Sequence, residues 1–425
     1  MKKLYFILAI TLCFNSFSQK VDCRTTEAMK WLYENDTKAK LQNDEFEKFT
    51  QNYIQTAQKS NTTGCYVIPV VFHVYGTTQS GKPINNSVIN FALAAMNLDF
   101  HGLNSDFNSV HQLFQSSKGS MPDVTFALAL LDPNGNTTTG VVYHPVAAGF
   151  GNSSGYDTQI AADAWDNFKY MNIYIQNDLY DDAVFTNSGI AWYPNTTMSN
   201  NKTARIVYNG AYLGANTSTE FASVLTHEYG HWLNLLHTFS GGCTMPNDNV
   251  ADTPECDYSS LNYTCHATPT DTYPANCNSI TVNAENYMDY SGAYGCYKMF
   301  SIGQVARMYT ALQHPSRISL WQPSNLVATG LSQLCSSTGI ITLSSNQFNV
   351  NVYPNTAGDL LTILSSEVSV ETNYTITDQL GRTVLYGKLN STHQNINVTH
   401  LVPAIYYFNV QEKGKLLASR KIIKH

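Results

Sequence analysis

The sequence predicts an α+β protein with two folded parts: a large domain that combines a mixed, twisted sheet with helices, and a small β-sandwich after it. Before about residue 320, runs of β-branched residues alternate with segments of helical apolar spacing. Small and polar residues predominate in residues 321–345, which we interpret as a linker. Residues 346–425 contain short alternating strands separated by turn signals. The length of 425 residues agrees with two to three domains.

The composition excludes two classes of partner. An apolar fraction of 43% is sufficient for a folded core. The net charge of −7 argues against nucleic acid and against anionic membrane surfaces, because both attract basic proteins. Beyond the N-terminus, no run reaches the ~18 apolar residues that a membrane-spanning helix needs. We therefore expect no nucleic-acid partner and no transmembrane span.

The N-terminus predicts export. Residues 1–18 begin with two lysines, continue with an apolar run too short to span a bilayer and end in small polar residues, as in a cleaved signal peptide. A retained membrane anchor is the alternative. Residues 19–60 are charged and helical in propensity, and they contain too few β-branched residues to form a core alone. We interpret them as a pro-segment that packs against the domain of residues 61–320.

Within that domain, apolar spacing predicts the main elements in order. The run from Cys65 (CYVIPVVFHVYG) is typical of a buried strand. Apolar residues at helical spacing predict a helix over 87–100. Further strands are expected at 124–131, from Met171 and at Gly189–Trp192 (GIAW), and a closing helix is expected over 299–312.

The stretch 226–239, THEYGHWLNLLHTF, contains three histidines. His227 and His231 are four residues apart on a predicted helix, so both imidazoles lie on one face and can reach one metal ion. Glu228, beside the first of them, suits a general base for a metal-bound water. The pattern is H-E-x-x-H.

The third histidine predicts that the helix ends. His237 lies six residues after His231, and on a continuous helix it would be rotated by roughly 240° and point away from the metal. Asn234 stands where a turn is needed, and Asn tolerates the left-handed conformation of such turns. Three neutral imidazoles and a water would form an open catalytic zinc site. Ordinary histidines of a buried helix are the alternative.

HEYGHWLNLLHTF resembles the long zinc motif of the metzincins, and HTFSGGC…NVADTP…NYMDYS resembles the pappalysin (cytophagalysin) branch of that clan, peptidase family M43. The resemblance covers roughly residues 65–315. It implies a metzincin catalytic domain with an irregular, disulfide-bonded lower subdomain, and a zinc endopeptidase acting on proteins or peptides. The metzincin motif has Gly where this chain has Asn234, and we expect the turn to survive that difference.

The run Asn286–Ser291 (NYMDYS) resembles the Met-turn of the clan. The resemblance places Met288 beneath the zinc as a hydrophobic floor. It also brings the Tyr290 hydroxyl towards the oxyanion of the reaction. Gly292 and Ala293 follow where basic-specific relatives have an acidic residue, so a preference for Arg or Lys after the scissile bond does not carry over.

In metzincins an edge strand above the cleft pairs with extended substrate, and Gly189–Trp192 is our candidate for it. An interior strand is the alternative. At the start of the active-site helix, Thr217 and Glu220 match a capping box.

The loop after the third histidine is rich in oxygen donors. Asp248, Asp252 and Thr253 are hard ligands of the kind that Ca²⁺ prefers. Members of the pappalysin family bind structural calcium in this region, which makes these residues a candidate calcium site. A solvated turn cluster is the alternative.

The chain has nine cysteines, and removal of the signal peptide with Cys13 leaves eight, at positions 23, 65, 243, 256, 265, 277, 296 and 335. In an exported chain they favour disulfides. The resemblance implies the pairs Cys243–Cys277 and Cys265–Cys296, which spacing alone does not establish.

One cysteine lies in the predicted pro-segment. In several metzincins a pro-segment cysteine occupies the metal position of the catalytic water. The opening VDCRTT resembles such a segment, so Cys23 is a candidate latency switch, with Asp22 as an alternative carboxylate ligand. A plain disulfide or a thiol without a function in latency is the other interpretation.

The C-terminal residues resemble an export address. The YPN from Tyr353, the LGR from Leu380 and the terminal KIIK are similar to those of type IX secretion sorting domains. This resemblance implies the type IX secretion machinery as a partner, export through the periplasm, and a secreted or cell-surface location. An adhesive module is the alternative, and with it a surface adhesin that has a metzincin-like fold.

Overall fold

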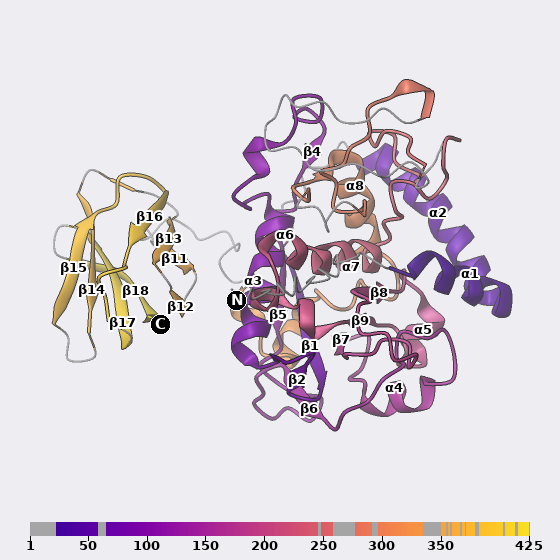
Figure 1. Ribbon diagram of the computed structural model, residues 1–425, viewed down its shortest axis with the longest axis horizontal. Coiled ribbons are helices and arrows are strands. Elements are labelled where there is room, and N and C mark those ends of the chain that lie inside the picture. The colour runs from indigo at the N-terminus through magenta and orange to yellow at the C-terminus, as the bar shows by residue number, and fades with distance from the viewer. Residues whose placement is uncertain are drawn as a thin grey trace, which may run out of the picture. The chain divides into compact units, whose positions relative to one another are not determined.

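A computed structural model of the chain describes residues 23–57, 65–244, 248–257, 277–290, 296–334 and 350–424, the last with gaps at 354–355, 358, 366–367, 370, 379–381, 403 and 413–414. The chain forms two compact units, Met1–Thr338 and Gly339–His425 (Figure 1). The predicted signal peptide, residues 1–18, lies outside the described residues. Among the helices described, none is both long enough and apolar enough to cross a membrane.

The first unit is built on a six-stranded sheet in the order β5-β1-β7-β9-β8, with β6 also paired to β1. Its strands are parallel except for β8, which is antiparallel to β9 at the edge. Their bounds are β1 Tyr66–Tyr75, β5 Val124–Leu128, β6 Val141–His144, β7 Met171–Ile175, β8 Gly189–Ala191 and β9 Ile206–Tyr208. Every residue of β1 is buried, as expected for a central parallel strand covered on both faces. Strand β8, the candidate for pairing with substrate, is the last in this order and is therefore an edge strand, as predicted.

The helices of the first unit are α1 Thr25–Asn35, α2 Thr37–Ala57, α3 Asn86–His101, α4 Asp157–Asp163, α5 Thr196–Asn200, α6 Thr219–Ala222, α7 Val224–Trp232, α8 Ile302–Ala311 and α9 Pro323–Ala328. Short 3-10 helices cover Phe107–Ser109, Gly210–Tyr212, Gly214–Asn216, Cys277–Ser279 and Ser332–Leu334. Two small sheets pair β2 Thr78–Gln79 with β3 Lys82–Pro83, and β4 Lys118–Gly119 with β10 Phe300–Ser301.

The active-site helix begins differently from the prediction. Instead of one helix capped by Thr217 and Glu220, the chain forms α6 and then α7, with Ser223 between them. The Ser218 hydroxyl accepts a hydrogen bond from Phe221 N at 3.3 Å, so the cap is one residue later than the capping-box pattern indicated. Thr226 of α7 donates to the buried Asp99 carboxylate of α3 at 2.6 Å, which fixes α7 against the core.

The stretch 321–345 is not a linker throughout. Its first part contains α9, whose Leu326 packs with Leu331 and with Val67 of β1 in a buried cluster. The carbonyl of Thr329 accepts hydrogen bonds from two backbone amides that follow β5, at 3.0 and 3.1 Å. Because these contacts tie the segment to the sheet, the first unit extends to Thr338, beyond the predicted boundary at 320.

The helices α1 and α2, which contain most of the predicted pro-segment, pack on the first unit beside α8 (Figure 1). Ala28 and Met29 of α1 are buried in a cluster with Trp192 and Tyr193. Phe46 of α2 is buried in the main core of the unit. As predicted, the segment makes no core of its own and packs on the domain that follows.

The second unit consists of two sheets, β11-β13-β16 and β12-β18-β17-β14-β15. Their strands are β11 Val350–Tyr353, β12 Thr356–Ala357, β13 Leu360–Ser365, β14 Thr372–Thr377, β15 Thr383–Lys388, β16 His393–Asn397, β17 Ala404–Glu412 and β18 Lys415–Lys424. Except for the parallel pair β12 and β18, neighbouring strands are antiparallel. Leu361, Ile363 and Phe408 belong to a core separate from that of the first unit.

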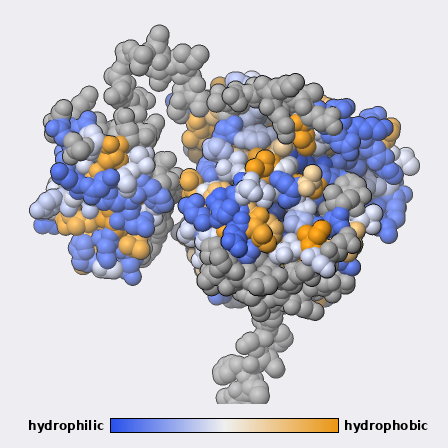
Figure 2. All heavy atoms as spheres, turned by 90° about the horizontal axis from the view of Figure 1, so that it is seen from above, coloured by the Kyte–Doolittle hydropathy of each residue, from blue (hydrophilic) through white to orange (hydrophobic). Residues whose placement is uncertain are grey.

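Figure 2 shows a face of the protein on which, among the coloured residues, hydrophobic side chains form small separate groups between hydrophilic ones. Scattered hydrophobic groups of this kind are normal on a folded protein surface.

Candidate active site

Two of the three motif histidines project from α7. His227 and His231 are buried, and their Nε2 atoms lie 3.1 Å apart. Each Nδ1–H donates to a backbone carbonyl, from His227 to Tyr287 at 2.6 Å and from His231 to Leu235 at 2.7 Å. These bonds fix the ring orientations and leave the lone pair of each Nε2 facing the other.

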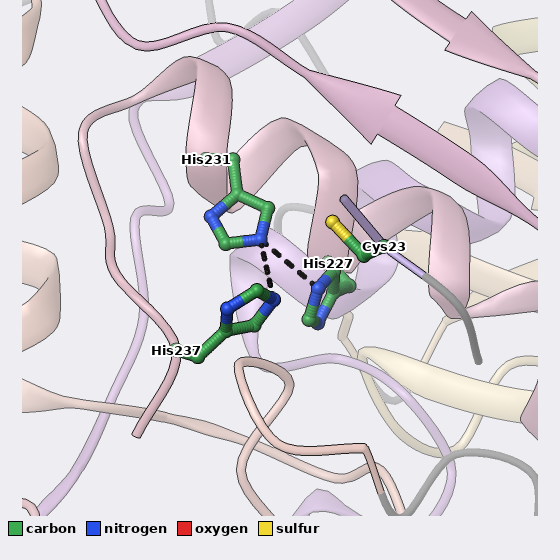
Figure 3. Close-up of side chains that lie close together, drawn as sticks. All are labelled: Cys23, His227, His231 and His237. Atoms are coloured by element: carbon green, nitrogen blue, oxygen red, sulfur yellow. Dashed lines mark hydrogen bonds between the residues drawn. The ribbon is translucent and has the colours of Figure 1, made fainter. Parts of the chain in front are cut away.

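The helix ends at the residue that the spacing of the third histidine indicated. Asn234 has φ = 71°, in the left-handed region. Leu235 N donates to Gly230 O at 2.9 Å and Asn234 N to His231 O at 2.8 Å, which is the pattern of a Schellman-type helix end. The turn brings His237 Nε2 to 3.1 Å from His231 Nε2 (Figure 3).

The three imidazoles form a site that fits a zinc ion. Burial lowers the pKa of His227 to about 4 and holds the pKa values of His231 and His237 well below the ordinary value, so all three rings are neutral. Neutral nitrogen lone pairs 3.1 Å apart repel one another unless a cation lies among them. Nitrogen ligands of this kind and number are those of open zinc sites.

Glu228 lies beside these nitrogens and is fully buried. Its Oε2 accepts a hydrogen bond from the Cys23 thiol at 3.6 Å, whereas its Oε1 has no hydrogen-bond partner among the described residues. Burial raises the pKa of the Glu228 carboxyl well above its usual value, and the Cys23 contact acts in the opposite direction. A buried carboxylate oxygen without a partner is suited to receive a hydrogen bond from a bound water.

The close approach of β8 to Glu228 requires glycine at one position. A Cβ atom on Gly189 would lie 2.7 Å from Glu228 Oε1 and 2.8 Å from both Glu228 Cγ and Tyr208 Cδ2. The Tyr208 ring is fully buried, so it cannot move away and the Glu228 side chain would have to shift. This constraint was missed in the sequence, where Gly189 is only the first residue of a predicted strand.

We expect Gly189→Ala to lower kcat for casein on the order of 10²-fold, because a displacement of about 1 Å at a catalytic group has effects of that size. Zinc content and the circular dichroism spectrum serve as controls and should match those of the wild type. Unchanged kcat in a folded, zinc-loaded variant would show that β8 does not set the position of Glu228.

Cys23 lies at the same place. Its Sγ and one nitrogen of each of the three histidines all lie within 4.8 Å of one another, the only such group found among the described residues (Figure 3). Cys23 forms a parallel bridge to Gly189, and Thr25 Oγ1 both donates to Ala191 O at 3.0 Å and accepts from Ala191 N at 3.2 Å. The predicted pro-segment therefore pairs, through Cys23 and Thr25, with the edge of the sheet next to the histidines.

Met288 and Tyr290, predicted from the Met-turn resemblance, both lie near the histidines. Met288 is fully buried beneath α7, where a Cβ atom on Gly230 would lie 2.4 Å from its Sδ. The Tyr290 ring packs edge-on against His237 with centroids 4.9 Å apart. Its hydroxyl donates to Cys23 O at 2.5 Å, so it reaches a peptide carbonyl beside the histidines.

The candidate calcium residues have two different environments. Thr253 Oγ1 lies 2.8 Å from both carboxylate oxygens of Asp248 and 3.0 Å from Val250 O. Asp252 instead accepts hydrogen bonds from Ser301 Oγ at 2.6 Å and Gly303 N at 2.9 Å. Asp252 thus binds the N-terminus of α8, whose cap is Ser301, and the oxygen cluster consists of the other two side chains with the Val250 carbonyl.

The disulfide Cys243–Cys277 is present, with a Cα–Cα distance of 5.2 Å, as the resemblance implied. Cys65 and Cys296 are also disulfide-bonded, and Cys256 is buried without a disulfide. Several residues named from the sequence lie outside the described residues: Asp22, Cys265, Gly292, Ala293 and Cys335.

Two family models match this chain, and one of them covers the site. Residues 154–313 match the model of peptidase family M43, described as pregnancy-associated plasma protein-A. Residues 351–425 match the model of the secretion system C-terminal sorting domain.

Individual relatives show the same likeness. An extracellular metalloprotease of Verticillium alfalfae is 30% identical over 246 residues, which are 55% of this chain and 78% of the relative. An extracellular metalloprotease of Sordaria macrospora is 36% identical over 146 residues, or 33% of this chain and 47% of that one. The solved structure of a Tannerella forsythia promirolysin mutant is 25% identical, with a TM-score of 0.53 and coverage of 72% of this chain and 97% of that chain.

Proposed function

We propose, because this chain belongs to the M43 family of metalloproteases, that its three-histidine zinc site and Glu228 hydrolyse internal peptide bonds of proteins outside the cell. The chain is a secreted metalloprotease with a C-terminal type IX sorting domain. The observation that carries the proposal is the convergence of three neutral imidazole nitrogens beside a buried carboxylate oxygen that has no partner among the described residues.

In the proposed mechanism, His227, His231 and His237 would hold a zinc ion, which would supply polarisation of the scissile carbonyl and a lower pKa for the attacking water. Glu228 accepts the proton of that water through its unpartnered Oε1 and then delivers it to the leaving amine. The Tyr290 hydroxyl donates a hydrogen bond to the carbonyl oxygen as negative charge develops there. Its present bond to Cys23 O supports this role, because the acceptor is a peptide carbonyl at the same place.

Substrate binding is assigned to β8. In the latent chain, Cys23 and Thr25 use the hydrogen-bonding groups of Gly189 and Ala191 at the sheet edge. An extended peptide can use the same groups once the pro-segment is gone, because pairing with a sheet edge needs only backbone atoms. Proteins and peptides are therefore the proposed substrates.

We also propose that Cys23 keeps the enzyme latent by occupying the metal position where the water would bind. Its thiol lies with the three histidines and is hydrogen-bonded to Glu228, so both the metal position and the base are engaged by the pro-segment. The thiolate is the form that would bind zinc, and the Glu228 carboxylate that now accepts the thiol hydrogen bond could take up the released proton. Asp22 remains the alternative ligand from the same segment.

For Cys23→Ala we expect casein hydrolysis by the freshly purified proenzyme to rise by about tenfold or more, because a ligand tethered in the same chain acts at a high effective concentration. Cys256→Ala, which removes a buried cysteine outside the site, is the matched control and should stay latent. Unchanged latency of Cys23→Ala would remove the switch.

A calcium ion is proposed at Asp248 and Thr253. One hydroxyl proton of Thr253 faces three oxygen atoms, and burial raises the pKa of Asp248 to about 7. A cation among these hard oxygen donors would compensate the charge of the buried Asp248 carboxylate. Because both carboxylate oxygens of Asp252 accept hydrogen bonds from the N-terminus of α8, we assign Asp252 a structural role beside this site and not the role of a calcium ligand.

The competing hypothesis is a surface adhesin whose function resides in the C-terminal unit. Deletion of residues 346–425 distinguishes the two. We expect the truncated chain to cleave casein at the rate of the full chain within about twofold, because the two units have separate cores. A folded truncated chain that has lost casein cleavage would show that residues 1–345 are not sufficient for proteolysis.

A further inference from the structure

Arg307 of α8 lies behind the metal site with only 1% of its side chain exposed. Its Nε–H donates to Asn234 O at 2.6 Å. Its Nη1 and Nη2 donate to the two carboxylate oxygens of Glu47, at 2.8 and 2.5 Å. One guanidinium therefore joins the turn after α7 to helix α2 of the proposed pro-segment. Asn234 of the turn and Glu47 of α2 are 187 positions apart in the sequence.

Asn234, Glu47 and Arg307 each form a hydrogen bond with the other two. Asn234 Nδ2 donates to Glu47 Oε1 at 3.1 Å, so Glu47 holds the side chain of Asn234 while Arg307 holds its carbonyl. Next to Glu47, the buried Phe46 packs edge-on against His314, with ring centroids 4.5 Å apart. This part of α2 is thus docked by a bidentate ion pair, in which Arg307 is buried and Glu47 is 20% exposed, and by an aromatic contact, independently of Cys23.

Asn234 connects these contacts to the zinc ligands. Its carbonyl is held from outside by Arg307, and Leu235, the next residue, accepts the Nδ1–H of His231. His237 follows two residues later. The orientation of two metal ligands therefore depends on a turn whose outer face is fixed by Arg307.

We propose that Arg307 is a positioning residue of the zinc site and that Glu47 is its counter-ion until activation, so that the pro-segment is held by a second anchor besides Cys23. This inference rests on the proposed function, in which the histidines hold zinc and the segment with Glu47 is removed. Arginine suits the role because its planar fork can hold a carbonyl and both oxygens of a carboxylate at once, which lysine cannot do. An exposed ion pair would contribute little to stability. The pair of Arg307 and Glu47 differs because Arg307 is buried and also bonds the turn between His231 and His237.

The proposal predicts two separate effects. Arg307 acts in both the latent and the mature enzyme, because Asn234 O remains its partner after activation. Glu47 acts only while the pro-segment is attached. Loss of Arg307 should therefore weaken zinc binding, whereas loss of Glu47 should weaken latency.

The first experiment measures zinc affinity of the mature enzyme by competition with a chromophoric chelator, for the wild type, Arg307→Gln and Arg307→Lys. We expect Arg307→Gln to bind zinc about 10- to 100-fold more weakly, the range found for outer residues that orient metal ligands. Arg307→Lys keeps the charge and should fall between the two. If Arg307→Gln does not fold, Arg307→Lys decides: weaker zinc binding supports the proposal, and wild-type affinity overturns it.

The second experiment follows the latent chain. We expect Glu47→Gln to shorten the lag before casein hydrolysis begins by about tenfold, because a charge-assisted bidentate contact is lost. Glu45→Gln, an exposed position on the same helix, is the matched control and should keep the wild-type lag. Equal lags for the two variants would overturn the assignment of Glu47 as an anchor.

These outcomes separate the inference from the proposed function. A wild-type protein that binds no zinc would remove the function itself. A wild-type protein that binds zinc, together with folded Arg307 variants of equal zinc affinity, would remove only the role of Arg307.

Discussion

We expect Glu228→Gln to lower kcat for casein hydrolysis by about 10²- to 10⁴-fold, the contribution of a positioned general base. The amide has nearly the shape of the carboxylate but cannot take the proton from the attacking water. Because the three histidines are unchanged, zinc content should equal that of the wild type. KM should change little, since backbone pairing at β8 does not involve this side chain.

The stability of this variant provides the control. Burial raises the pKa of Glu228 well above its usual value, which means that the charged form is unfavourable in the folded protein. A neutral amide should therefore not lower the melting temperature of the metal-free chain. A variant that melts as the wild type does, binds zinc and still cleaves casein at the wild-type rate would exclude Glu228 as the base.

The second large effect is expected on removal of the metal. Treatment with a zinc-selective chelator should lower casein hydrolysis by about 10²-fold or more, because the ion supplies several kcal/mol of transition-state stabilisation. Added zinc should restore the activity, whereas added calcium alone should not. Since the candidate calcium residues are hard oxygen donors and the histidines are nitrogen donors, the two ions can be distinguished in this way.

Metal analysis of the purified protein accompanies this experiment. Stripped enzyme that digests casein at the original rate would contradict the whole metal-dependent mechanism. Wild-type zinc content in a variant with one of the three ligand histidines replaced, such as His237→Ala, would contradict the ligand assignment alone.

The sequence predicted the site best where the residues that determine the local backbone geometry are close together in the chain. The spacing between His231 and His237 requires a turn, and helical geometry places it at Asn234, whose φ is 71°. The edge strand was predicted from the short apolar run at Gly189–Trp192 and from the resemblance to metzincins. These predictions depend on residues within a few positions of one another.

The parts that could not be predicted depend on contacts between distant segments. Nothing near Arg307 in the sequence indicates that Glu47 is its partner. The linker prediction for 321–345 failed in its first part because small polar residues surround Leu326 and Leu331, and only the fold reveals that these two leucines meet Val67. Likewise, the need for glycine at position 189 arises from the Glu228 side chain, which comes from another element.

The depth of the metal site has a consequence for the exchange of zinc. His227 and His231 have no exposed surface, His237 has 1% and Cys23 has 3%. The N-terminal segment lies against these atoms: Thr26 Oγ1 of α1 lies 3.2 Å from His237 Nδ1, and Cys23 lies beside all three rings. We therefore expect the three histidines to exchange zinc with solution more slowly while the N-terminal helices are in place than after their removal.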